Sequence, residues 1–90
     1  MRVQALVAWN LRRLRVGRGL SQESLAVDAG IDRTYVSRLE RGLENPTVGI
    51  LDQIAQALDA GIVEFFVLPS PDELPPKPLP GGRRTRGNRG

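Results

Sequence analysis

Hydrogen-bond donors recur along one segment in the middle of this chain, and they are the residues best suited to chemistry. Counted from the first of them, donors return after one, four, five and eight residues, which places them on one side of a helix. A guanidinium can donate as a fork to the two acceptors of guanine in the major groove, and hydroxyls can bond bases or phosphates. We therefore expect this face to contact duplex DNA; its members are Arg33, Thr34, Ser37, Arg38 and Arg41.

Two short helices joined by a tight turn are predicted to carry this face. Ser21 can accept a hydrogen bond from the free amides in the first turn of one helix, and Asp32 can do the same for the helix that follows. Gly30 lies where the first helix should end in a left-handed residue. Val36 and Leu39 are expected to face inward from the second helix. This order is typical of a helix-turn-helix, although an isolated basic helix is more often only a solvated face.

The flanking segments are expected to complete an all-α domain of five helices. A first helix should cover about residues 3–16, and a fourth should begin after Thr47, which can cap it. Gly61 permits a turn into a short fifth helix over residues 62–68. Trp9 lies off the apolar stripe of the first helix, so the sequence assigns it neither to the core nor to a contact surface.

The fifth segment is more apolar than one short surface helix can bury against its own domain. We expect part of it to contact a second copy of the chain, which would give a homodimer. The alternative is that Ile62 and Phe65 only close the core of the monomer. The candidate dimerisation residues are Ile62, Val63, Phe65 and Phe66.

Residues on both sides of the motif follow one recurring pattern. They are Leu11, Leu14-Arg15, Leu20-Ser21-Gln22, Leu25-Ala26, Ala29-Gly30-Ile31, the run from Val36 to Gly42, Asn45-Pro46-Thr47, Leu51, Ile54-Ala55 and Ala57-Leu58. Over this stretch, from about Val7 to Phe66, the chain closely resembles the helix-turn-helix domain of phage Cro and repressor proteins, often called the XRE family. The segment from Ile31 to Arg38 and the small size look like the controller proteins of restriction-modification systems.

The resemblance implies roles for individual residues. Arg33, Thr34 and Arg38 would occupy base-reading positions, and Ser37 is a further candidate for base readout on the same face. Gln22 would bind a phosphate and brace the recognition helix, while Arg41 and Asn45 match positions that grip the DNA backbone. An internal ion pair, structural in role, is implied between Arg15 and Glu40.

Composition excludes several classes of function. The 90 residues contain neither cysteine nor histidine, so the usual general base, zinc ligands and disulfides are all missing. The carboxylates are scattered over caps and helix faces without a paired constellation. We expect a cytoplasmic non-enzyme with no metal and no cofactor. No segment approaches the roughly 20 apolar residues of a membrane span.

Charge separates the predicted domain, residues 1–68, from a tail, residues 69–90. The domain has eight arginines against eight Asp and Glu, so the whole net charge of +3 lies in the tail. The tail is rich in proline and then in arginine and glycine, a composition that predicts disorder. Its arginines could add salt-dependent contacts to phosphates, or the tail could serve only solubility.

Together these features predict a sequence-specific regulator of transcription. The expected form is a homodimeric repressor that reads an inverted-repeat operator on double-stranded DNA. One alternative is an antitoxin-like interaction protein whose main partner is another polypeptide held by the apolar C-terminal segment. Another is a non-specific nucleic-acid binder that acts through the arginine tail and needs neither Arg33 nor Arg38.

Overall fold

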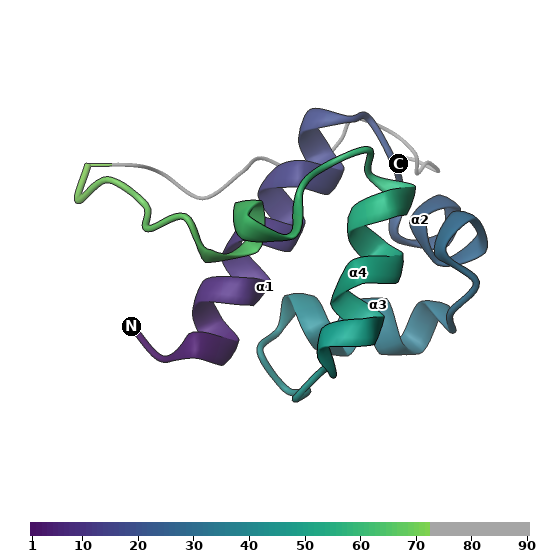
Figure 1. The fold of residues 1–90 in the computed structure, drawn as a ribbon, viewed down its shortest axis with the longest axis horizontal. Helices are drawn as coiled ribbons and strands as arrows, with labels where there is room; N and C mark the ends of the chain where they lie inside the picture. The colour runs from purple at the N-terminus through teal and green to yellow at the C-terminus, as the bar shows by residue number, and fades with distance from the viewer. Residues whose placement is uncertain (73–90) are drawn as a thin grey trace, which may run out of the picture.

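Helices account for nearly all regular structure in residues 1–72, the part of the chain that the computed structural model describes (Figure 1). No strand occurs within these residues, so the all-α prediction is confirmed for them. None of their helices has the length and apolar character needed to cross a membrane. The helices are α1 (Val3–Gly17), α2 (Gln22–Ala29), α3 (Arg33–Glu40), α4 (Val48–Ala57) and a short 3-10 helix, η1 (Ile62–Phe66).

The predicted fifth α-helix is wrong, because residues after Gly61 form a 3-10 helix of five residues. Val67 is already extended, with φ −74° and ψ 124°. Pro69 then disfavours the α conformation at Leu68, so the segment cannot lengthen into an α-helix. The predicted tail from residue 73 onward lies outside the described residues.

Side-chain caps start the three helices that follow α1. Ser21 Oγ accepts from the Ser24 amide at 3.0 Å, Asp32 Oδ1 accepts from the Thr34 amide at 2.8 Å, and Thr47 Oγ1 accepts from the Ile50 amide at 3.1 Å. Gly30 ends α2 with a left-handed backbone, φ 71° and ψ 33°. The tight turn between α2 and α3 therefore has the caps and the terminating glycine that the sequence predicts.

The core lies between α1, α2, α3, α4 and η1, and α2 packs against both α3 and α4. Each helix contributes apolar side chains from one face, as the helical spacing requires. Phe65 of η1 is completely buried among them, which joins the C-terminal segment to the domain. The other fully buried apolar side chains are Leu11, Leu25, Val36, Leu39, Ile54 and Leu58.

A buried asparagine fastens the C-terminal segment to α1. Asn10 is fully buried, and its amide nitrogen donates to the carbonyls of Phe65 and Val67, at 2.8 Å each, and to that of Leu6 at 3.1 Å. Arg13 Nε donates to the side-chain oxygen of Asn10, Oδ1, at 3.1 Å. These bonds satisfy polar groups that would otherwise be buried without partners. Asn10 thereby fixes the course of the chain as it leaves η1.

Candidate nucleic-acid interface

The outward face of α3 carries the predicted base-reading residues. Val36 and Leu39 are buried beneath it, while Arg33 and Thr34 are exposed and Ser37 and Arg38 are half-buried. Asp32 caps α3, so the exposed Arg33 and Thr34 are its first two residues. The structure therefore brings all four predicted side chains together on one short helix.

An ion pair joins the C-terminal end of this helix to α1. Arg15 binds Glu40 through two parallel hydrogen bonds: Nε donates to Oε2, and Nη2 donates to Oε1 at 3.0 Å. The two side chains are only 10% and 4% exposed. The third nitrogen of Arg15, Nη1, donates to the Leu20 carbonyl at 2.8 Å. Such a planar, two-point contact fixes orientation as well as distance.

Gln22 adds α2 to the same cluster. Its Nε2 donates to Glu40 Oε1 at 3.1 Å, which links the start of α2 to the end of α3. An amide nitrogen has two N–H groups, and Glu40 needs only one of them. The second N–H remains for an acceptor outside the domain, at the first residue of α2.

The loop after α3 positions two residues predicted to grip the DNA backbone. Arg41 is exposed, and among residues 1–72 its side chain bonds only the Ser37 carbonyl of α3, from Nε at 3.4 Å. The Asn45 side-chain oxygen accepts from Gln4 Nε2 at 2.8 Å. The Asn45 amide nitrogen has no acceptor within residues 1–72, so both of its N–H groups are available. This contact also ties the loop to the start of α1.

Two residues near Arg38 were missed by the sequence reasoning. Glu44 Oε2 accepts from Arg38 Nε at 2.6 Å. Tyr35 is half-buried beside them, and its burial, assisted by the Glu44 carboxylate, raises the pKa of its hydroxyl above the ordinary value of 10.0. Tyr35 thus remains a protonated hydrogen-bond donor at neutral pH. Neither residue had a signal in the helical spacing, because Glu44 lies in the loop and Tyr35 lies between the core and the donor face.

The predicted dimerisation residues divide into a buried set and an exposed set. The prediction that Phe65 contacts a second chain is wrong, because its side chain is completely buried in the core of its own domain. Ile62 is half-buried and packs against the same core. Val63 and Phe66 remain 70% and 44% exposed, and the following Val67 and Leu68 extend the apolar surface. We call the four exposed residues the C-terminal apolar strip: Val63, Phe66, Val67 and Leu68.

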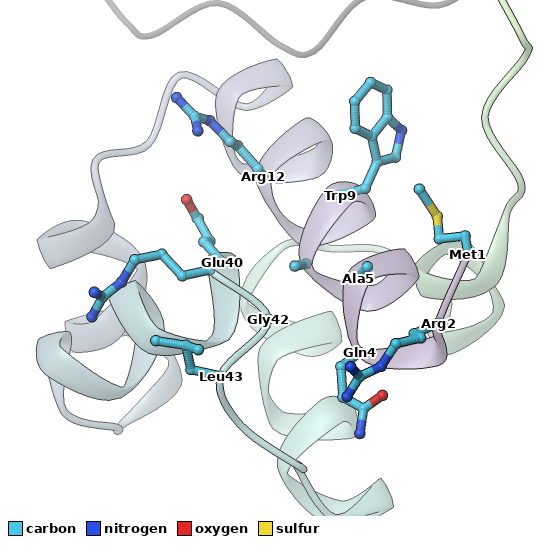
Figure 2. Close-up of a pocket in the computed structure, with 11 residues that line it drawn as sticks. Met1, Arg2, Gln4, Ala5, Trp9, Arg12, Glu40, Gly42 and Leu43 are labelled. Atoms are coloured by element: carbon cyan, nitrogen blue, oxygen red, sulfur yellow. The ribbon is translucent and has the colours of Figure 1, made fainter.

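Trp9 lines a shallow cavity of about 560 Å³ between α1 and the residues that follow α3. Figure 2 shows Trp9 and Arg12 projecting from α1, with Glu40 and Leu43 across from them. Arg12 Nε is buried and has no hydrogen-bond acceptor among residues 1–72. The tryptophan that the sequence left unassigned is therefore neither a core residue nor part of the α3 face.

Comparison with known families gives this geometry an identity. A family model described as helix-turn-helix matches residues 11–65, more than half of the chain. The chain belongs to this XRE-type helix-turn-helix family. The matched residues cover α1 from Leu11 onward, all of α2, α3 and α4, and η1 up to Phe65.

Relatives of this helix-turn-helix chain are regulators of transcription. An uncharacterized HTH-type transcriptional regulator of Sinorhizobium fredii, y4dJ, is 45% identical over 75 residues, which cover 83% of this chain and 95% of that protein. The crystal structure of a hypothetical transcription factor from Neisseria superposes with a TM-score of 0.73 at 38% identity, covering 76% and 78% of the two chains. The controller protein C.Esp1396I, crystallised as a tetramer with its natural 35 base-pair operator, gives a TM-score of 0.68 at 33% identity, covering 73% and 87%.

The Arg15–Glu40 pair generates a stability prediction. Arg15→Ala should lower the free energy of unfolding by about 3 to 5 kcal/mol, because it leaves the buried Glu40 carboxylate without its main partner. Urea denaturation followed by circular dichroism measures the change. Arg18→Ala is the control: Arg18 is exposed and makes a single bond to the Asp59 carbonyl, so its loss should cost less than about 1 kcal/mol. Equal stability of the two variants would contradict the assignment.

Proposed function

We propose that this protein is a homodimeric transcription repressor that binds an inverted-repeat operator in double-stranded DNA. It acts in the cytoplasm by occluding a promoter, and it performs no catalysis of its own. Each protomer places α3 in the major groove, and its control comes from protein concentration and dimerisation. The observation that carries this proposal is the donor face of α3, held in place by the Arg15–Glu40–Gln22 cluster.

The chemistry of that face matches the edges of base pairs. Arg33 is exposed and has no hydrogen-bond or ion-pair partner within residues 1–72, so its donors are available to a guanine. Thr34 and Ser37 supply hydroxyl groups that can bond bases or phosphates. A helix held by a buried two-point ion pair loses little further freedom when it enters a groove, which favours selective binding.

Phosphate contacts would flank the reading face on both sides. On one side, Gln22 has a spare donor at the start of α2, where the partial positive charge of the helix terminus also favours an anion. On the other side, Arg41 and Asn45 hold free donors after the end of α3. Contacts of this kind set the register and orientation of a protein on DNA without reading its sequence.

The controller protein C.Esp1396I supports the proposed placement of α3 on DNA. C.Esp1396I was crystallised on its operator, and variants of it have been made in which an arginine, the next threonine and the next tyrosine were changed singly. The same three residue types follow one another here as Arg33, Thr34 and Tyr35 at the start of α3. Tyr35 is half-buried next to Thr34, and its hydroxyl keeps its proton at neutral pH, so we add it to the proposed DNA-contacting residues.

The C-terminal apolar strip supports a homodimer. Its four side chains are exposed and lie between Val63 of η1 and Leu68. Asn10 bonds the backbone of this segment to α1. Apolar surface concentrated in this way is typical of a protein contact. Pairing through a two-fold axis would set two α3 helices about 34 Å apart, on successive turns of one face of the duplex.

Selection of genomic fragments at physiological salt tests the proposed specificity. Wild-type protein should recover a short inverted repeat, because two recognition helices related by two-fold symmetry read two related half-sites. The Arg33→Ala, Arg38→Ala double variant should fail to select that repeat, since each good fork to guanine contributes about 1 to 3 kcal/mol of discrimination. Indiscriminate binding by both proteins would contradict the proposal and favour the antitoxin-like or non-specific alternative.

Substitution within the apolar strip tests the dimer. Phe66→Asp should shift the protein to monomer in sedimentation over a dilution series, because it would bury an unpaired charge in the contact. Val27→Asp is the matched control, since Val27 is also apolar and 75% exposed but lies on α2. The control should sediment as wild type. Identical sedimentation of the Phe66→Asp variant and wild type would exclude this surface as the contact.

A further inference from the structure

We propose that Glu44 is a specificity-determining residue, which fixes the guanidinium of Arg38 for an end-on contact with guanine and limits its attraction to phosphates. The proposal rests on the proposed function, because it concerns how Arg38 reads DNA. Glu44 touches Arg38 directly, through the 2.6 Å bond between Nε and Oε2. It acts as a positioning residue: its effect on DNA runs through Arg38.

The bonds that Arg38 makes occupy one edge of its guanidinium. Nε donates to Glu44, and Nη2 points toward the Leu43 carbonyl at 3.4 Å. Nε and Nη2 form the side edge of the planar group, while Nη1 and Nη2 form its end. No partner of Nη1 occurs within residues 1–72. The end of the fork therefore stays available for the O6 and N7 acceptors of guanine.

The backbone after α3 keeps the acceptors in place. Gly42 adopts a left-handed conformation, φ 71°, and its amide donates to the Leu39 carbonyl at 3.0 Å. The Leu43 amide donates to the Arg38 carbonyl, also at 3.0 Å. This helix-ending turn folds the chain back over the last residues of α3. Leu43 and Glu44 are consequently brought beside the Arg38 side chain by fixed bonds.

The Arg38–Glu44 pair is partly exposed, and its two partners differ in how far they are enclosed. The Glu44 side chain is 27% exposed and that of Arg38 is 43% exposed, so the carboxylate is the more enclosed partner. Arg33, on the same face, has no carboxylate partner within residues 1–72. The two arginines should thus behave differently. Arg38 has a fixed guanidinium whose charge Glu44 compensates, whereas Arg33 is an uncompensated cation.

The charge of Glu44 also bears on non-specific binding. A free guanidinium is attracted to any phosphate, which raises affinity for all sequences alike. A carboxylate at 2.6 Å from Nε offsets much of that attraction and itself repels the DNA backbone. Glu44 would therefore lower the affinity for arbitrary DNA while leaving the guanine contact of Arg38 intact. Specificity depends on the difference between the affinity for the operator and the affinity for arbitrary DNA.

The test measures binding of full-length protein to the selected operator, to operators with single base-pair changes, and to random duplex. Arg33→Ala and Arg38→Ala first identify which guanine each arginine reads. Glu44→Ala should then reduce the preference at the Arg38 guanine from about 10-fold to less than about 3-fold, and leave the Arg33 guanine unchanged. Its affinity for random duplex should rise by about 3-fold or more.

Two further variants separate charge from geometry. Glu44→Gln keeps an oxygen acceptor for Nε but removes the charge, so it should retain most of the preference at the Arg38 guanine and still bind random duplex more tightly. Asp28→Asn is the control: it removes one charge from an exposed position near the end of α2. It should change neither the preference at the Arg38 guanine nor the affinity for random duplex. Thermal unfolding midpoints of the variants check that each is folded.

Full preference at the Arg38 guanine in Glu44→Ala would overturn the inference, as would an equal loss at the Arg33 guanine. In both cases the wild-type protein would still select an operator, so the proposed function would stand. Absence of selective binding by the wild type would instead overturn the proposed function and this inference together.

Discussion

The contact between Arg15 and Glu40 is the interaction on which the rest of the interface depends. It joins α1, the longest helix, to the C-terminal end of α3, and Gln22 brings α2 into the same cluster. An eight-residue helix has little stability of its own in water, so α3 needs such external support. Replacing the pair by apolar residues would often be neutral for stability, but it would discard the fixed orientation of two planar groups. The pair therefore holds α3 against α1 and also fixes its orientation, which an apolar pair of similar stability would not do.

The C-terminal segment shows the same division between what holds the domain and what faces outward. Phe65 enters the core, and Asn10 binds the carbonyls on both sides of the next residue, Phe66. The exposed side chains of the strip are thus carried on a backbone that the protomer has already ordered. A partner that covers them pays little entropy for ordering the segment. Dimerisation and the distance between two reading helices would then be set by the same short stretch of chain.

Local signals made much of this fold predictable from sequence. Ser21, Asp32 and Thr47 cap helices because a short polar side chain needs only the next turn as its partner, and Gly30 ends α2 for an equally local reason. The features that sequence missed depend on contacts through space. Asn10 bonds residues more than fifty positions away, and Glu44 meets Arg38 only because the Gly42 turn folds back. The 3-10 form of η1 likewise follows from its short length before Pro69, which apolar periodicity does not reveal.

The central claim is that α3 reads guanines from the major groove, and methylation interference on the selected operator tests it most directly. Dimethyl sulfate methylates guanine at N7 in the major groove and adenine at N3 in the minor groove. N7 methylation should block binding at guanines in two clusters about one helical turn apart, and N3 methylation of adenines in these clusters should have no effect. Interference from adenine N3 alone, or from no base at all, would contradict the account.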